Sequence, residues 1–169
     1  VQNHLLQLLA LTAMEPPVSF EADSVRDEQA KILQAIQPYT PEGVLQCAVR
    51  GQYGEGKIDG KKVDGYRSEP NVAAFSNTET FAALKLSIDN WRWQGVPFYL
   101  RSGKALSCRT TQIVIQFHAP PHKLFDDSPS SLGESNRLVI QVQPAEGIQM
   151  HFQTKVPDAG MRMRQTDLN

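Results

Sequence analysis

Residues 88 to 104 read Ile-Asp-Asn-Trp-Arg-Trp-Gln-Gly-Val-Pro-Phe-Tyr-Leu-Arg-Ser-Gly-Lys, and the predicted fold is organised around this stretch. Both tryptophans of the chain lie in it, two residues apart. It connects two segments with the side-chain alternation of β-strands, residues 80–89 and 97–101. Because no long helix separates these strands, as a parallel crossover would need, we expect an antiparallel pair.

The alternation continues on both sides of this stretch and predicts further strands. Residues 143–147, Gln-Pro-Ala-Glu-Gly, combine restricted and permissive backbone, which predicts a hairpin between the last two strands. The sequence therefore predicts an α+β fold, with a largely antiparallel sheet of about six or more strands and helices packed on one face. The predicted strands are residues 44–53, 80–89, 97–101, 112–117, 137–143 and 148–154.

Two helices are predicted before the strands. Residues 3–14 are almost all apolar or small, which indicates a helix buried on most of its circumference. A second helix is predicted at residues 25–36, where Ser24 can cap the first turn and Val, Ile and Leu form a stripe. Prolines follow both segments and end them. The Gly-rich residues 54–65 and the Pro-rich residues 119–133 are expected to be exposed loops.

Composition and charge exclude several classes of function. A chain of 169 residues with 40% hydrophobic and 21% charged residues fits one globular domain. With 17 Lys and Arg against 18 Asp and Glu, it lacks the basic field that attracts nucleic acid or acidic membranes. Its apolar runs are far below the roughly 18 to 20 residues of a membrane span. We expect neither partner.

The cysteines and the ends of the chain indicate its context. Cys47 and Cys108 have no metal-binding or disulfide-scaffold spacing, which is typical of a reduced, cytoplasmic compartment. A helical pattern is already established at His4, without a capping residue before it. Residues 161–169 offer no packed closing element. We therefore expect an internal piece of a longer protein.

Two side chains are candidates for chemistry by residue type. His4 carries an imidazole, which can accept a proton reversibly near neutral pH. On residue type alone, a histidine in a leucine-rich helix is more often structural. Lys104 follows Ser102 and Gly103 in a predicted turn, where its ammonium can donate three hydrogen bonds to a sugar or an anion. A lone loop lysine is more often simply solvated.

Other motifs have simpler explanations. The glycines of residues 51–56 follow a strand, as in a dinucleotide loop, but no helix follows them to receive a pyrophosphate. His118 and His122 flank Ala-Pro-Pro and lack a third ligand, so no metal site is predicted. Trp91 and Trp93 suggest a sugar-stacking platform, but we expect them to fill core or interface space.

Residues 88–104, together with residues 1–7, Val-Gln-Asn-His-Leu-Leu-Gln, resemble two segments of glucose-6-phosphate dehydrogenase in the same order. The resemblance covers essentially the whole chain and implies that His4 is the general base. It implies that Lys104 contacts the sugar, with Arg109 as a second cation and Gln143 as a neighbouring amide. Gln143 has an equally good explanation as a solvent-facing strand residue.

The resemblance also implies a reaction and its cofactor. The family oxidises β-D-glucose 6-phosphate at C1 to 6-phosphoglucono-δ-lactone and reduces NADP, the entry step of the pentose phosphate pathway. His4 would take the C1 hydroxyl proton while the hydride leaves for the nicotinamide. The aspartate that orients this histidine in the family would lie before Val1. Residues 1–169 would be a partial C-terminal domain that lacks the dinucleotide-binding domain and the extreme C-terminus.

The resemblance has further implications for the activity, a second nucleotide site and the assembly of the protein. Alone, the chain would be inactive, since the catalytic NADP site and the family's phosphate-binding motif lie outside it. Arg101 matches a contact to a second, structural NADP in animal relatives, but the companion positions differ, so this site stays open. Its sheet resembles the one through which the family forms dimers or tetramers. The alternative is a noncatalytic module for self-association or sugar-phosphate binding. The companion positions at which this chain differs from the animal relatives are Thr110, Gln141, Gln149 and His151.

Overall fold

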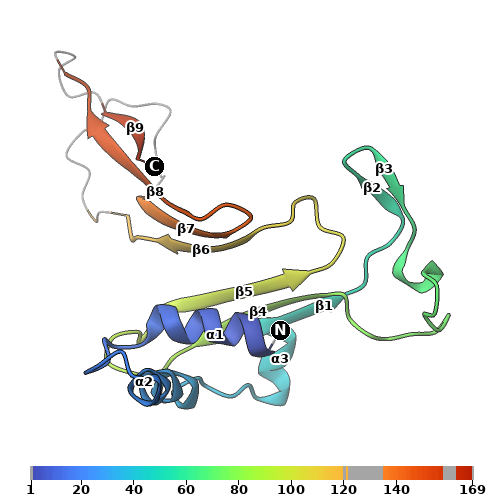
Figure 1. Ribbon diagram of the computed structural model, residues 1–169, viewed down its shortest axis with the longest axis horizontal. Helices are drawn as coiled ribbons and strands as arrows, with labels where there is room; N and C mark the ends of the chain where they lie inside the picture. The colour runs from blue at the N-terminus through green and yellow to red at the C-terminus, as the bar shows by residue number, and fades with distance from the viewer. Residues whose placement is uncertain (1, 120, 122–134, 158–162, 169) are drawn as a thin grey trace. The chain divides into compact units, whose positions relative to one another are not determined.

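The computed structural model describes residues 2–119, 121, 135–157 and 163–168 of the chain (Figure 1). It divides into two compact units, Val1–Ser107 and Cys108–Asn169, and each is described by itself. None of the helices in these described ranges is long and apolar enough to cross a lipid bilayer.

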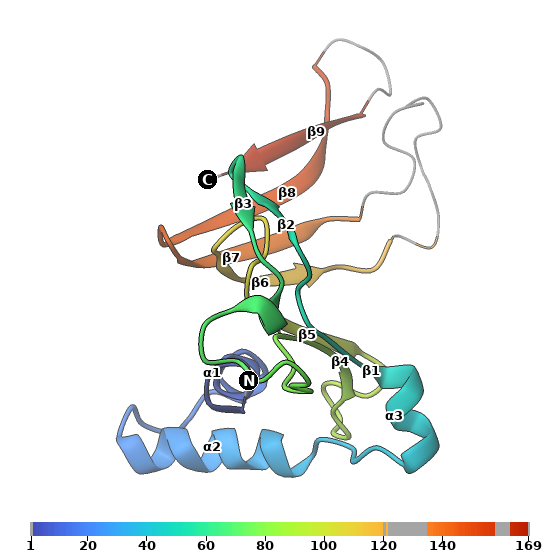
Figure 2. The same ribbon diagram turned by 90° about the vertical axis from the view of Figure 1, so that its right-hand side faces the viewer.

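Unit 1 contains three α-helices and two antiparallel sheets within the described residues. The larger sheet has the strand order β1-β4-β5, and α1 and α2 lie on the same face of it (Figure 2). The smaller sheet is the β2–β3 hairpin. The elements are α1 (Gln2–Ala13), α2 (Ala22–Gln34), α3 (Pro41–Cys47), β1 (Ala48–Gly51), β2 (Gly56–Ile58), β3 (Lys61–Val63), the 3-10 helix η1 (Tyr66–Ser68), β4 (Phe81–Ser87) and β5 (Pro97–Gly103).

Unit 2 is a four-stranded antiparallel sheet with the order β6-β7-β8-β9. The predicted hairpin at 143–147 is confirmed, because β7 ends at Gln143 and β8 begins at Gly147. The prediction that residues 161–169 form no closing element is wrong. Residues 163–168 form a strand, and the Thr154 and Thr166 hydroxyls meet at 2.6 Å across it. The strands are β6 (Thr111–Gln116), β7 (Arg137–Gln143), β8 (Gly147–Lys155) and β9 (Met163–Leu168).

The predicted α+β class and antiparallel pairing are confirmed, but the strands are divided among three sheets. Residues 104–110, between β5 and β6, are not in strand conformation. Ala105 in this segment has a φ of 54°, a value that a β-strand does not contain. The alternation on either side of the segment predicts the strands correctly, but it carries no information about which strands share a sheet.

The core of unit 1 lies between α1, α2 and the β4–β5 pair. Its buried cluster is Leu9, Ala13, Ile32, Leu86, Ile88 and Leu100. Ile88, just beyond β4, is the most completely buried large side chain at 2% exposure. Its backbone bridges Ile36, just beyond α2. The end of α2 is thereby fixed to the edge of the sheet.

Two predictions between residues 44 and 65 are wrong because short local motifs override the strand alternation. Residues 44–47 belong to α3 rather than to a strand, because the Thr40 side chain accepts a hydrogen bond from Gly43 N at 3.1 Å and Pro41 occupies the first turn. Residues 54–65 contain a hairpin, because Asp59 and Gly60 both adopt positive φ in a tight turn. The predicted exposed loop at 119–133 lies almost entirely outside the described residues.

The predicted helices exist, with different details. Glu21, rather than Ser24, precedes the first turn of α2, and its side chain makes no capping hydrogen bond. In α1, Leu9 and Ala13 are buried but Leu11 is 45% exposed, so burial is one-sided. The prediction of burial around most of α1 is wrong because, within the described residues, α1 packs on α2 and β5 and leaves the side of Leu11 exposed.

The two tryptophans also differ from each other. Trp93 packs against the core, and its Nε1 donates to Ala13 O at 2.8 Å, as a packing role predicts. Trp91 is fully exposed, so it does not fill the core of the described chain, and a place in an interface stays a prediction for it. The reason is that both residues lie in a turn and not at the end of a strand. Their spacing of two therefore does not place them on one face.

An ion pair joins the segment after α1 to the same turn. Arg92 Nε and Nη2 donate to the two carboxylate oxygens of Glu15, at 2.5 and 2.7 Å. These hydrogen bonds hold the pKa of Glu15 below its ordinary value of 4.5. A carboxylate with a lowered pKa stabilises the folded state above its unfolded pKa and loses that contribution as the pH falls through the folded pKa.

We expect Glu15→Gln to lower the unfolding midpoint slightly at about pH 7, and the difference from wild type to shrink towards about pH 4. The effect is small because both side chains are about half exposed. Thermal unfolding of the full-length protein across this pH range measures it. Asp64→Asn, which removes a longer exposed pair with Lys62, is the matched control. A deficit of constant size down to pH 4 would contradict the assignment.

Candidate functional site

Helix α1 carries His4, and its far end is anchored to the start of β5. The hydrogen bond from Trp93 to Ala13 O fixes the last residue of α1 beside the turn that precedes β5. Helix α1 packs against β5, and Figure 1 shows the two elements running in opposite directions. His4 lies about 13 Å along the helix from Ala13, towards the end of unit 1 at which β5 finishes. Figure 1 shows the start of α1 near the arrowhead of β5.

The His4 side chain is exposed, on the face of α1 that also carries Gln7 and Leu11. Within the described residues, its ring makes no hydrogen bond or ion pair. An exposed imidazole at a helix face is accessible to a substrate, and in its neutral form one of its two nitrogens can accept a proton.

Lys104 is the first residue after β5. Its backbone N donates to Thr80 O at 2.8 Å, and its side chain is exposed. The described part of the chain offers its ammonium no carboxylate within ion-pair distance. Lys104 thus presents a cation without an ion-pair partner among the described residues. It lies at the same end of unit 1 as the His4 end of α1. These are the two predicted site residues of unit 1, and both lie at this end.

Arg109 and Gln143 belong to unit 2 and lie at one end of its sheet. Gln143 is the last residue of β7 and pairs with Thr111, the first residue of β6. Its carbonyl oxygen accepts a hydrogen bond from the Thr110 hydroxyl at 3.1 Å. Arg109 is exposed and directly precedes Thr110. The four predicted site residues are therefore two pairs, one in each unit.

The structure also contains side chains near Lys104 that the sequence pattern does not mark. Thr80 donates a backbone hydrogen bond to Gly51 O and accepts hydrogen bonds from Lys104 N and Tyr53 N. Burial raises the pKa of the Tyr53 hydroxyl, and the hydrogen bond to Glu69 at 3.2 Å raises it further. Tyr53 is therefore a neutral, fixed group at physiological pH. The sequence marks Thr80 merely as the first residue of the predicted strand 80–89.

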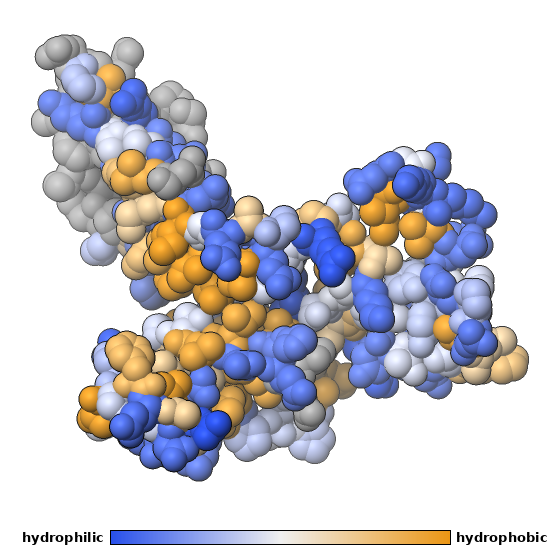
Figure 3. Space-filling view, viewed as in Figure 1, coloured by the Kyte–Doolittle hydropathy of each residue, from blue (hydrophilic) through white to orange (hydrophobic). Residues whose placement is uncertain are grey.

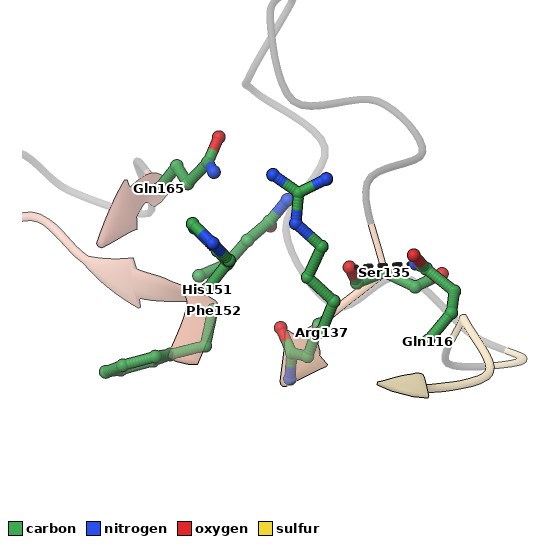
Figure 4. Close-up of a pocket in the computed structure, with 8 residues that line it drawn as sticks. Gln116, Ser135, Arg137, His151, Phe152 and Gln165 are labelled. Atoms are coloured by element: carbon green, nitrogen blue, oxygen red, sulfur yellow. Dashed lines mark hydrogen bonds between the residues drawn. The ribbon is translucent and has the colours of Figure 1, made fainter. Parts of the chain in front are cut away.

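Two cavities lie elsewhere, one in each unit. In unit 1 a cavity of about 310 Å³ is lined by Arg50, Gly51, Gln52, Arg67, Asn77 and Glu79. In unit 2 a cavity of about 170 Å³ includes Gln116, Ser135, Arg137, His151, Phe152 and Gln165 in its wall (Figure 4). The Gln116 amide donates to Ser135 O at 3.1 Å on one side of it. Neither cavity is lined by a predicted site residue.

Positions that would hold a structural NADP in animal relatives are partly engaged within unit 2. His151 Nδ1 lies 2.6 Å from the Asp167 carboxylate. The Gln141 amide donates to the Thr110 hydroxyl at 2.6 Å. Arg101 is exposed on β5, in unit 1. Gln141 is neutral and His151 lies against a carboxylate, so these two do not complete with Arg101 the cationic set that a nucleotide phosphate needs. We therefore derive no structural NADP site from this chain.

Metal and catalytic NADP sites have no basis in the described residues. They contain no group of three His, Cys, Asp or Glu side chains that could hold a metal ion. His118 is exposed, and His122 lies outside the described residues. The glycines of residues 51–56 lead into β2 and not into a helix. They do not fit a dinucleotide, because no helix N-terminus is present to bind its pyrophosphate.

Comparison with known proteins places this geometry in context. The family model described as "Glucose-6-phosphate dehydrogenase, C-terminal domain" matches residues 1–169. The chain is 48% identical to a glucose-6-phosphate 1-dehydrogenase of Aggregatibacter actinomycetemcomitans, with 99% of the chain and 33% of that protein aligned. It is 50% identical to the enzyme of Chlamydia pneumoniae, with 93% of the chain and 30% of that protein aligned.

Solved structures agree with these relatives. A glucose-6-phosphate dehydrogenase in complex with its substrate glucose 6-phosphate superposes with a TM-score of 0.84 at 40% identity. The alignment covers 99% of this chain and 32% of that one. A second structure, the enzyme from Mycobacterium avium, gives a TM-score of 0.77 at 38% identity, covering 99% and 33% of the two chains. The chain therefore spans about a third of the length of the proteins it matches.

Proposed function

Because this chain belongs to the glucose-6-phosphate dehydrogenase family, as a match to its C-terminal domain, we propose that it is the substrate-binding part of an NADP-dependent glucose-6-phosphate dehydrogenase. The full-length enzyme oxidises glucose 6-phosphate at C1 to 6-phosphoglucono-δ-lactone, in the oxidative pentose phosphate pathway. The observation that carries the proposal is the family match over the whole chain, together with the free imidazole and free ammonium at one end of unit 1.

The four site residues have separate roles in this proposal. His4 accepts the proton of the C1 hydroxyl. Lys104 donates hydrogen bonds to sugar oxygens from the other element at the same end of unit 1. Arg109 and Gln143, from unit 2, orient the sugar through a guanidinium and an amide. NADP takes up the hydride, and the part of the enzyme outside this chain binds it. We assign the enzyme to the cytoplasm.

Exposed apolar side chains support a role for the chain within a larger protein. Leu45, Phe75 and Trp91 are 86%, 90% and 100% exposed. Figure 3 shows apolar residues on the visible surface of both units. Large exposed apolar side chains are typical of surfaces that contact another domain or subunit. We propose that the full-length enzyme is a homodimer or homotetramer and that this chain contributes to its interface.

The test is the reduction of NADP by glucose 6-phosphate, followed by the absorbance of NADPH. We expect activity from the full-length protein and none from residues 1–169 alone, because the described residues contain no unit of strand, glycine-rich loop and helix that could bind a dinucleotide. Glucose without a phosphate, at the same concentration, is the control for the substrate. A folded full-length protein without this activity would contradict the proposal. It would favour a noncatalytic module for self-association or sugar-phosphate binding.

A further inference from the structure

Thr80 continues the ladder between β4 and β5 to the residue that carries the proposed sugar contact. The last pair of this ladder is Phe81 with Gly103, so Thr80 stands opposite Lys104. The hydrogen bond from Lys104 N to Thr80 O, at 2.8 Å, closes this additional step. Beyond it the backbone turns away, with Ala105 at a φ of 54°. The Thr80 carbonyl is thus the last fixed point before the turn.

Thr80 is itself held from the opposite side. Its backbone N donates to Gly51 O at 2.9 Å, and its hydroxyl accepts a hydrogen bond from Tyr53 N at 3.0 Å. Tyr53 is fixed in turn by Tyr66, through an edge-on ring contact at 5.7 Å and a backbone hydrogen bond of 3.0 Å. The Thr80 hydroxyl is the side-chain atom through which this anchored segment reaches Lys104.

Gly103 restricts the same backbone by close packing. A Cβ atom at this position would meet Phe81 Cδ2 at 2.8 Å and the Leu106 methyl groups at 3.3 Å. The first of these distances is shorter than a real carbon–carbon contact, so the Phe81 ring lies almost on the glycine backbone. The direction in which Lys104 leaves β5 is therefore set by Phe81 on one side and by Thr80 on the other.

We propose that Thr80 is a positioning residue that aligns Lys104 for glucose 6-phosphate. The inference rests on the proposed function of Lys104. If the Thr80 hydroxyl is removed, Tyr53 N loses its hydrogen-bond acceptor. The segment that holds Thr80 then loosens, and the Thr80 carbonyl becomes less firmly fixed. Small displacements of a substrate-positioning group have large effects on catalysis and binding. Here the displaced group contacts the sugar, so binding is affected more than the chemical step.

The experiment uses the full-length enzyme and compares Thr80→Val with Thr80→Ser. Valine has the shape of threonine without the hydroxyl, whereas serine keeps it. We expect Thr80→Val to raise the KM for glucose 6-phosphate about 3- to 10-fold, the value of one hydrogen bond, with kcat and the KM for NADP changed less than about twofold. Thr80→Ser should restore most of the wild-type KM. Thr78→Val is the matched control, since its hydroxyl has no hydrogen-bond partner among the described residues.

A double-mutant cycle with Lys104→Ala separates this inference from the proposed function. We expect Lys104→Ala alone to raise the KM for glucose 6-phosphate, and Thr80→Val to add nothing in that background. Multiplying effects would overturn the positioning role, as would an unchanged KM for Thr80→Val or a matching rise for Thr78→Val. An unchanged KM for Lys104→Ala would overturn its proposed sugar contact. If Thr80→Val does not fold, Thr80→Ala takes its place.

Discussion

Replacing His4 with asparagine should lower the kcat of the full-length enzyme by about 10²- to 10⁴-fold, the usual contribution of a general base. This corresponds to about 3 to 5 kcal/mol of activation free energy. The physical reason is that oxidation at C1 requires loss of the hydroxyl proton, and asparagine cannot accept it. His4 lies exposed on α1, without a partner for its ring within the described residues. Its removal should therefore disturb the fold little.

The measurement is the kcat for glucose 6-phosphate together with the affinity for the substrate. Because asparagine keeps a similar size, we expect substrate binding to remain within a few-fold of wild type, which a loss of folding would not permit. Gln7→Ala, one helical turn further along the same exposed face, is the matched control and should keep its kcat. Equal activity of wild type and His4→Asn would remove His4 from the mechanism.

The sequence was most informative where one physical rule determined the local structure. Residues 137–143 carry apolar side chains at every second position, 138, 140 and 142, with Val139 as an additional apolar residue, and they form β7 with those bounds. It was least informative where a short motif competes with alternation. Thr40 and Pro41 start a helix that extends into a predicted strand, and Asp59 and Gly60 make a hairpin within a predicted loop. Both motifs are visible in the sequence, since capping and turn residues are local signals.

The site divides in the same way. His4 and Lys104 are candidates because their segments resemble those of a known family, and their roles stay predictions. The geometry around Lys104 could not be identified in this way, because it depends on residues distant in the chain. Tyr53 lies 27 positions before Thr80, yet its backbone N meets the Thr80 hydroxyl. Periodicity reports which face of an element is buried, but it does not report which distant segment lies next to that element.

The largest expected effect on stability belongs to Ile88. Ile88→Ala removes a side chain that is 2% exposed from the cluster between α1, α2 and the sheet. We expect a local destabilisation of about 2 to 5 kcal/mol, which combines the lost transfer free energy and the cavity that remains. The backbone around it fixes α2 to the sheet, since Gln37 N donates to Ser87 O at 2.9 Å and Asp89 N to Ala35 O at 2.8 Å.

Hydrogen exchange of these two amides in the full-length protein is the direct measurement, because the unfolding of a multidomain enzyme is not a single two-state transition. A loss of 2 kcal/mol or more corresponds to about 30-fold faster exchange where opening is local. Ile88→Val, which keeps the branched shape, is the matched control and should cost only about 0.5 to 1.5 kcal/mol. Equal exchange rates in the alanine and valine variants would mean that the cluster closes around the missing atoms. Ile88 would then not be the residue that holds α2, and with it α1, on the sheet.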